Sequence, residues 1–236
     1  MRNNLDIYDA VADQWWSDDI RWIRTLKNLV SGRLSWMDGQ FDWSDKTVLD
    51  LGCAGGFMAE ALADRGARVT GIDPAAEAIE AARAHARQAD REIDYDVGVG
   101  ESLPYPDASY DAVVCVDVLE HVQDLAQVLS EVHRVLKPGG RFLFDTINRN
   151  PLARLAAITV AEDILRLLPK GIHDPALFIK PAELRAALDE TGLVAGPFTG
   201  LGPRGINRRG DLIFGRLPLT AILYMGTADK PMAASG

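Results

Sequence analysis

The chain has 236 residues, of which 47% are hydrophobic and 25% are charged, and this is the composition of an ordinary globular protein. Its net charge of −9 argues against a general nucleic-acid binder, because such proteins attract phosphates with basic surfaces. Two cysteines cannot form a disulfide framework, which points to a reducing compartment such as the cytoplasm. No apolar run is long enough to span a bilayer, and the opening MRNNLDIYDA lacks the apolar stretch of a signal peptide.

Strands and helices are expected to alternate through the middle of the chain. The apolar runs read as buried strands, and the longer segments between them read as helices. The expected order is strand 47–51, helix 58–65, strand 67–72, helix 75–89, strand 93–97, strand 111–116, helix 125–136 and strand 141–146. This alternation predicts a Rossmann-like α/β fold with a mostly parallel sheet and helices on both faces. A ligand would then bind beyond the carboxyl ends of the strands.

A glycine-rich turn follows the first expected strand, in the segment Asp50-Leu51-Gly52-Cys53-Ala54-Gly55-Gly56. Glycines allow a tight turn and a close approach of the backbone to a ligand, and the next helix offers free N–H groups at its start. Asp73 ends the second strand, 21 residues beyond Gly52, where an acid can accept two hydrogen bonds from ribose hydroxyls. Turn and acid together predict a nucleoside-containing cofactor.

The charge of the turn indicates which nucleoside cofactor is expected. The spacing G-x-x-G-G fails the dinucleotide fingerprint G-x-G-x-x-G. The carboxylate of Asp50 would repel a pyrophosphate, but it would attract an ammonium or sulfonium group. A cationic amino-acid cofactor is therefore favoured over NAD.

The turn and the segment Val69-Thr70-Gly71-Ile72-Asp73 resemble those of class I methyltransferases, which bind S-adenosylmethionine. The resemblance implies a seven-stranded, mostly parallel sheet with an antiparallel C-terminal strand. The usual turn of these enzymes is D/E-x-G-x-G-x-G, and Ala54 replaces its middle glycine here. The cofactor contacts that the resemblance implies come from Asp50, Gly52, Gly55, Asp73 and Val116, and from Glu101 and Ser102 near the adenine.

Asp117, Glu120 and His121 directly follow the strand expected at 111–116. If a helical turn begins there, the three side chains share one face at positions i, i+3 and i+4. Two carboxylates and an imidazole at the end of a strand could hold a metal ion or act as a general base. Many class I methyltransferases instead carry a metal-free Glu-His pair at this point, where it orients loops or substrate.

A closer resemblance extends over nearly the whole chain. Its segments are Tyr8-Asp9, Trp15-Trp16, Arg33-Leu34, residues 146–151, Ala161-Glu162, residues 169–174 and residues 178–184. They resemble the ubiquinone-biosynthesis O-methyltransferases, the 3-demethylubiquinol and polyprenyl-catechol methylases. The resemblance implies that Arg33 contacts the cofactor's carboxylate and that Asp117, Glu120 and His121 bind a divalent cation, usually described as magnesium. A histidine ligand leaves manganese, iron or zinc open as well, and the family normally has Glu at Asp117 and Met at Val116.

Residues 152–181 are expected to form a helical insertion between the fifth strand and a helix that starts at Pro181. Thr159, Glu162, Asp163 and Arg166 would make one polar stripe, opposite a wide apolar face. The segment is either a core-packed or lid helix, or an interfacial helix that touches lipid. The resemblance implies peripheral membrane contact on the inner face of the membrane. Its basic residues toward anionic headgroups would be Arg154, Arg166, Lys170 and Lys180.

The charge distribution changes where the insertion begins. Residues 1–150 carry 15 basic and 26 acidic side chains, a net charge of −11, whereas residues 151–236 have a net charge of +2. We expect one methyltransferase domain over residues 1–228, with 152–181 as a cap, rather than two domains. Residues 200–215 are expected to be a loop, 222–225 a last strand, and 229–236 a disordered tail.

The expected function is S-adenosylmethionine-dependent O-methylation of a phenol or catechol, in particular a polyprenylated quinone precursor. Methyl transfer would be an in-line displacement by oxygen, eased either by a cation that stabilises the oxyanion or by His121 acting as a base. The alternative is a small-molecule methyltransferase of specialised metabolism with an O, N, S or phosphonate acceptor, which Asp117 and the divergent 200–216 segment motivate. A non-catalytic scaffold or lipid-bound accessory protein is the third hypothesis.

Overall fold

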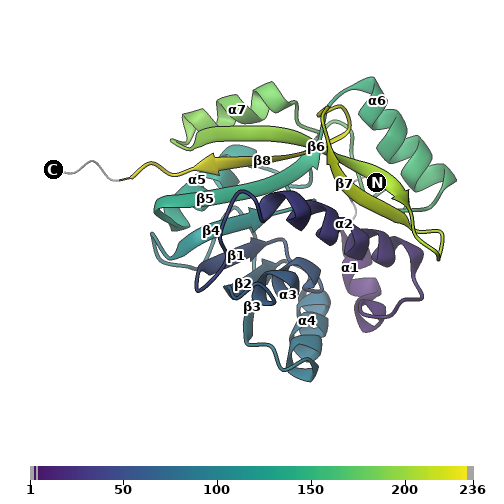
Figure 1. The fold of residues 1–236 in the computed structure, drawn as a ribbon, viewed down its shortest axis with the longest axis horizontal. Coiled ribbons are helices and arrows are strands. Elements are labelled where there is room, and N and C mark those ends of the chain that lie inside the picture. The colour runs from purple at the N-terminus through teal and green to yellow at the C-terminus, as the bar shows by residue number, and fades with distance from the viewer. Residues whose placement is uncertain (1–2, 4, 233–236) are drawn as a thin grey trace.

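One twisted sheet forms the centre of the molecule (Figure 1), seen in a computed structural model that describes residue 3 and residues 5–232. Over these residues eight strands follow the order β3-β2-β1-β4-β5-β8-β6-β7. The strands are β1 (Thr47–Leu51), β2 (Arg68–Asp73), β3 (Ile93–Val97), β4 (Tyr110–Cys115), β5 (Leu136–Ile147), β6 (Val194–Ile206), β7 (Leu212–Leu217) and β8 (Leu223–Asp229). Strands β1 to β5 pair in parallel, whereas β8 pairs antiparallel with both β5 and β6, and β7 pairs antiparallel with β6.

Helices cover both faces of this sheet. Helices α2 (Arg21–Met37), α3 (Phe57–Ala63) and α4 (Ala76–Gln88) pack on one face around a core that includes Met37, Leu62 and Ile79. Helices α5 (Leu125–Val135) and α7 (Pro181–Glu190) pack on the other face around Val132 and Leu184. The remaining helical segments are α1 (Asp6–Ala10), η1 (Ala12–Gln14), α6 (Pro151–Arg154) and η2 (Leu155–Ile164). No helix among the described residues is long and apolar enough to cross a membrane.

The alternation of strands and helices predicted between residues 47 and 135 is confirmed to within one or two residues at most ends. The parallel strands β1, β2, β4 and β5 bring their carboxyl ends to one edge of the sheet, as expected for such a fold. That edge carries the glycine turn, Asp73 and the segment from Val116 to His121.

Three predictions about the second half of the chain are wrong. Strand β5 begins at Leu136 rather than at Arg141. The expected loop at 200–215 is the hairpin of β6 and β7. The sheet therefore has eight strands over the described residues and not the expected seven. The hairpin packs on α2 so closely that a Cβ on Gly32 would lie 2.9 Å from the Phe214 backbone. The segment is therefore a pair of hydrogen-bonded strands and not a loop.

The predicted tail is also ordered in part. Strand β8 runs to Asp229, whose carboxylate accepts a hydrogen bond from Arg141 at 2.6 Å. The Lys230 ammonium donates to the carbonyls of His133 and Leu136, at 2.7 and 2.8 Å. These contacts tie residues 229 and 230 to the sheet, while residues 233–236 of the predicted tail lie outside the described residues.

The insertion begins as α6 and continues as a π-helix, η2. Its winding, with bonds from residue i+5 to residue i such as Leu165 N to Val160 O at 2.8 Å, turns side chains away from the α-helical pattern assumed in the sequence. The expected polar stripe is therefore broken, because Glu162 is only 2% exposed. The apolar face is divided as well: Ile158 packs in the core, whereas Ile164 is 66% exposed.

Candidate active site

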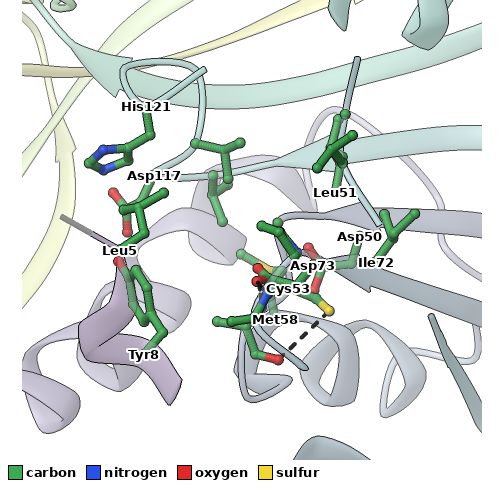
Figure 2. Close-up of a pocket in the computed structure, with 18 of the residues that line it drawn as sticks. Leu5, Tyr8, Asp50, Leu51, Cys53, Met58, Ile72, Asp73, Asp117 and His121 are labelled. Atoms are coloured by element: carbon green, nitrogen blue, oxygen red, sulfur yellow. Dashed lines mark hydrogen bonds between the residues drawn. The ribbon is translucent and has the colours of Figure 1, made fainter. Parts of the chain in front are cut away.

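A cavity of about 680 Å³ opens at the carboxyl ends of the parallel strands. Figure 2 shows Asp50, Cys53 and Asp73 on one side of it, and Tyr8, Asp117 and His121 on the other. Its size is typical of a site for a small ligand or cofactor. All the predicted cofactor residues except Gly55 and Ser102 line this cavity, together with the predicted catalytic residues Asp117 and His121.

The glycine turn is shaped by its neighbours. Gly52 has a φ of +78°, and a Cβ there would lie 2.2 Å from the Cγ2 atom of Val118. A Cβ on Gly55 would lie 2.0 Å from the indole of Trp15. Ala54, which replaces the usual middle glycine, has a φ of +43° and so holds a backbone conformation that is rare for a residue with a side chain.

Asp73 is positioned by the same turn. Its two carboxylate oxygens accept hydrogen bonds from the backbone N–H groups of Ala54 and Ala75, at 2.8 and 2.9 Å. Burial raises the pKa of Asp73, while these two bonds lower it. The carboxylate is therefore fixed at the end of β2, where the sequence predicts that it meets a ribose.

Asp50 is fully buried in β1 and lines the cavity. Neither of its carboxylate oxygens has a hydrogen-bond partner among the described residues. Burial and the nearby charge of Asp73 raise the pKa of Asp50 to about 7. A buried carboxylate without a partner favours a cationic ligand, as the sequence predicts for this turn.

The segment after β3 forms another wall. Gly98, Val99, Gly100 and Glu101 line the cavity, and so does Val116 at the end of β4. Ser102 is not among the described lining residues, so the expected adenine contact stops one residue earlier. Glu101 accepts a hydrogen bond from the backbone of Gln123 at 3.3 Å, which joins this wall to the segment after His121.

Arg33 lines the cavity but is held by two carboxylates. Its Nε donates to Asp145 at 2.6 Å, and its Nη2 pairs with Asp117. Arg33 is 2% exposed and Asp145 is fully buried, so each neutralises a charge that would otherwise be unpaired in the interior. The contact with the cofactor's carboxylate, implied for Arg33 by resemblance, would come from a guanidinium already engaged in this network.

The predicted helical turn at Asp117 is wrong. Asp117 has a φ of +56°, and its backbone N–H donates to Asp145 at 2.7 Å, so it lies outside the short turn closed by the bond from His121 N to Val118 O at 2.8 Å. In this left-handed conformation the Asp117 carboxylate pairs with Arg33, and its charge still acts on Glu120 and His121. The three residues therefore do not share one helical face.

Glu120 and His121 occupy a buried environment. One Glu120 oxygen accepts from the Thr146 hydroxyl at 2.7 Å, and burial together with the charges of Asp117 and Asp145 raises the pKa of Glu120 to about 8. Burial, followed by repulsion from His173, lowers the pKa of His121 to about 3. His121 is therefore a neutral imidazole at physiological pH.

Sequence reasoning missed His173 as a site residue. Among the described residues, ligand atoms of Glu120, His121 and His173 all lie within 4.8 Å of one another. The rings of His121 and His173 stack with centroids 5.1 Å apart. His173 lies 52 positions from His121 in the insertion, so no spacing rule could join them, although it belongs to a segment that carries the family resemblance.

The N-terminal segment covers the cavity, which was also not predicted. Asp9 accepts a hydrogen bond from the backbone of Glu77 at the start of α4, at 2.9 Å, and the Trp16 indole donates to Gly55 O at 2.9 Å. Tyr8 lines the cavity, and burial together with the charge of Asp117 raises the pKa of its hydroxyl. The segment thus forms part of the cavity wall, next to the glycine turn.

The chain is similar to known methyltransferases over most of its length. Residues 49–144 match the model of a methyltransferase domain. The chain is 40% identical over 195 residues to the ubiquinone biosynthesis O-methyltransferase of Pseudomonas paraeruginosa, covering 82% of this chain and 84% of that protein, and equally identical over 196 residues to that of Thiobacillus denitrificans, with the same shares covered.

Solved structures agree on the fold. An S-adenosylmethionine-dependent methyltransferase of Thermotoga maritima superposes with a TM-score of 0.68 at 18% identity, covering 95% of this chain and 98% of that one. One from Methanosarcina mazei gives 0.63 at 24% identity, covering 84% and 98%. A cavity lies at the strand ends, Asp73 lines it at the end of β2, and the similarity covers most of the chain. The chain is therefore an S-adenosylmethionine-dependent methyltransferase and belongs to the family of ubiquinone biosynthesis O-methyltransferases.

Proposed function

We propose that the enzyme methylates a phenolic oxygen of a catechol that carries a polyprenyl chain, an acceptor of the 3-demethylubiquinol type. The relatives' name, ubiquinone biosynthesis O-methyltransferase, supports this acceptor. The observation that carries the proposal is the single cavity that joins Asp73 to His121. Because the cavity is continuous, cofactor and acceptor can bind in it side by side.

At the cofactor end, the chain's own residues hold and orient the methyl donor. S-adenosylmethionine supplies the methyl group as an electrophilic sulfonium carbon. Asp73 accepts hydrogen bonds from its ribose, and the buried carboxylate of Asp50 favours its cationic amino-acid part. Glu101 lies along the cavity wall as the proposed adenine contact, and Val116 lines the cavity as a further proposed cofactor contact. Holding the donor in one orientation supplies much of the rate, because the displacement needs oxygen, carbon and sulfur in line.

At the acceptor end, His121 lines the cavity and orients the phenolic hydroxyl, while Glu120 is buried beside the cavity and does not line it. A divalent cation held there would make the phenol more acidic by stabilising its oxyanion. Because burial lowers the pKa of His121 to about 3, the imidazole is a weak base, and its ability to bind and orient is the more effective contribution. Asp117 takes part indirectly, because it holds Arg33 at the cavity wall.

We infer that a lipid-tailed acceptor approaches the enzyme at the insertion. We place residues 152–181 as a cap on a single methyltransferase domain, in peripheral contact with a membrane. Leu152, Leu155 and Ile164 are 53%, 52% and 66% exposed on it, an apolar surface without cover in the chain. The neighbouring basic residues Arg154, Arg166 and Lys170 would meet anionic headgroups.

Transfer of a labelled methyl group to two acceptors tests the acceptor class. The pair is a catechol with a short prenyl chain and the same catechol without it. We expect both to be methylated at oxygen, with a lower KM for the prenylated one. Transfer to small soluble acceptors of other chemistry, at nitrogen or sulfur, with none to either catechol, would replace this function by that of a small-molecule methyltransferase.

Vesicle sedimentation tests the membrane contact separately. We expect the protein to pellet with vesicles that contain anionic phospholipid, and Ile164→Glu to abolish this. Ile206→Glu is the matched control, because Ile206 is equally exposed, at 67%, but lies in the β6–β7 hairpin. Equal binding of wild type and both variants would exclude the insertion as the contact.

A further inference from the structure

Glu162 and His173, both in the insertion, form a buried pair that the methyl-transfer scheme does not use. Glu162 is 2% exposed and His173 is 5% exposed. One Glu162 oxygen accepts from the Nδ1 atom of His173 at 2.8 Å and from its backbone N–H at 3.2 Å, while the other accepts from Gly171 N at 2.8 Å. Burying a carboxylate costs free energy, and these hydrogen bonds offset part of that cost. Its contacts fix the ring of His173.

The ring that Glu162 fixes stacks on the ring of His121, which lines the cavity. Ligand atoms of His173, His121 and Glu120 lie within 4.8 Å of one another, and all three residues are buried. The second oxygen of Glu120 is buried and has no hydrogen-bond partner among the described residues. An unpartnered carboxylate oxygen beside two imidazoles is the arrangement expected where a cation completes the site.

The hydrogen bonds also assign the tautomers of both rings. The Nδ1 atom of His173 bonds to a carboxylate, so it carries the proton. The Nδ1 atom of His121 lies 2.6 Å from the side-chain oxygen of Asn3, whose amide nitrogen donates to the carbonyl of His121 at 3.1 Å, so it also carries the proton. In both rings the lone pair is then on Nε2. Histidine ligands of metal ions are typically held in this way, by a carboxylate or carbonyl at the other nitrogen.

We propose that Glu120, His121 and His173 bind a divalent transition-metal ion, with Glu162 and Asn3 as positioning residues for the two imidazoles. The proposal deepens the proposed function, on which it rests for the use of the site. It replaces Asp117, expected from the sequence as a ligand, by a histidine of the insertion. Two imidazoles and one carboxylate favour ions such as Zn²⁺ or Fe²⁺, whereas Mg²⁺ prefers a shell of oxygen ligands.

This ligand set makes the insertion part of the site. His173 and Glu162 come from the segment between β5 and α7, while Glu120 and His121 come from the segment after β4. The site is therefore complete only when the insertion is folded against the sheet. Asp117 keeps a different task, the neutralisation of Arg33.

Calorimetric titration of the full, metal-free chain with Zn²⁺ and with Mg²⁺ tests the proposal. We expect one Zn²⁺ per chain and at least ~100-fold weaker binding of Mg²⁺. His173→Gln should weaken Zn²⁺ binding at least ~100-fold and Glu162→Gln ~10- to 100-fold, as is usual for a ligand and for the group that orients it. His133→Gln, a histidine on α5 outside the cluster, should leave the affinity unchanged. Asp117→Asn removes a nearby charge but no ligand, so it should weaken binding much less than His173→Gln does.

A second readout keeps the test independent of turnover. Co²⁺ bound in place of Zn²⁺ gives visible absorption bands that report nitrogen ligands, and we expect these bands to change in His173→Gln and to persist in Asp117→Asn. Folding of each variant is checked by binding of S-adenosylhomocysteine. Absence of Zn²⁺ binding in wild type, an unchanged affinity in His173→Gln, or a loss confined to Asp117→Asn would each overturn the proposal. Catechol methylation that is unaffected by a chelator, with no Zn²⁺ bound, would overturn the metal site and leave the proposed function standing. Zn²⁺ binding without any catechol methylation would support the metal site and overturn the proposed function.

Discussion

The guanidinium of Arg33 and the carboxylate of Asp145 meet at 2.6 Å in the interior, where Arg33 is 2% exposed and Asp145 is fully buried. This pair joins helix α2 to strand β5 at the wall of the cavity, which Arg33 lines. Asp145 also accepts the backbone N–H of Asp117 at 2.7 Å, so it fixes the left-handed residue at the cavity wall. One buried ion pair thus supports both the fold and the shape of the site.

Asp145→Asn is expected to destabilise the protein by about 3 kcal/mol, because removing one partner of a buried pair leaves the other charge uncompensated. Urea denaturation measures the change. Asp107→Asn is the control, since Asp107 pairs with Arg134 at 2.9 Å but its side chain is 80% exposed, and it should change the free energy of unfolding by less than about 1 kcal/mol. Equal effects of the two variants would contradict the role given to Asp145.

Cofactor binding is expected to depend on the ionisation of Asp50. Burial raises its pKa to about 7, so the side chain is protonated in the free protein below that pH. A ligand with an ammonium group binds the ionised form, and its affinity should therefore rise by up to about 10-fold per pH unit below 7 and then level off. Titration with S-adenosylhomocysteine between pH 5 and 8 measures this rise, and Asp50→Asn should remove it.

The raised pKa of Asp50 also makes the stability of the folded protein depend on pH. Cofactor affinity should rise with pH, whereas the contribution of Asp50 to stability should fall. Because the folded state binds the proton of Asp50 more tightly than the unfolded state, the contribution of this residue to stability is present at low pH and is lost as the pH rises from about 4 to about 7. Asp50→Asn should therefore gain stability relative to wild type on going from pH 5 to pH 8. A difference between the two proteins that does not change with pH would contradict the assignment.

Asp73→Ala should abolish measurable cofactor binding, and Asp73→Asn should weaken it by about 3 kcal/mol, because charged hydrogen bonds to the ribose are lost. The alanine variant also removes the acceptors for Ala54 and Ala75 and loosens the turn. Calorimetry with S-adenosylhomocysteine measures both affinities. Asp94→Asn, exposed on β3, serves as the control, and unchanged affinity in Asp73→Ala would refute the ribose assignment.

Gly55→Ala should destabilise the protein by about 2 kcal/mol and weaken cofactor binding, because the new Cβ would meet the Trp15 indole at 2.0 Å. Gly205→Ala, where nothing lies within 4 Å of the added Cβ, should have little effect. Trp15→Val combined with Gly55→Ala should recover part of the lost stability, since it removes the clash. Thermal unfolding and cofactor titration measure both effects, and a well-tolerated Gly55→Ala would show that Trp15 does not pack there in solution.

The parallel half of the sheet could be predicted because its signals are local. Its strands are short apolar runs, and the segments between them contain local signals that end a helix or begin a turn. Asp73 and the glycine turn were placed by the same logic. The sequence does not predict that Gly52 and Gly55 leave room for Val118 and Trp15, because these neighbours are distant along the chain.

The acceptor end could not be predicted because its determinants are distant in sequence. Asp117 adopts a positive φ that the bonds to Asp145 and Arg33 stabilise, and these partners come from β5 and α2. His173 reaches the site through the π-helical insertion, whose winding also turns Glu162 inward. Helical spacing assumes 3.6 residues per turn, so it assigned Glu162 to a solvent-facing stripe.

The central claim is that methyl transfer to a catechol oxygen takes place in the cavity between Asp73 and His121. Single-turnover transfer from pre-bound labelled S-adenosylmethionine to a prenylated catechol tests it most directly, with the labelled position in the product located by NMR. The expected result is one labelled methyl group on a phenolic oxygen in wild type, and none in Asp73→Ala. A protein that binds the cofactor tightly but leaves every catechol oxygen unlabelled would contradict the account.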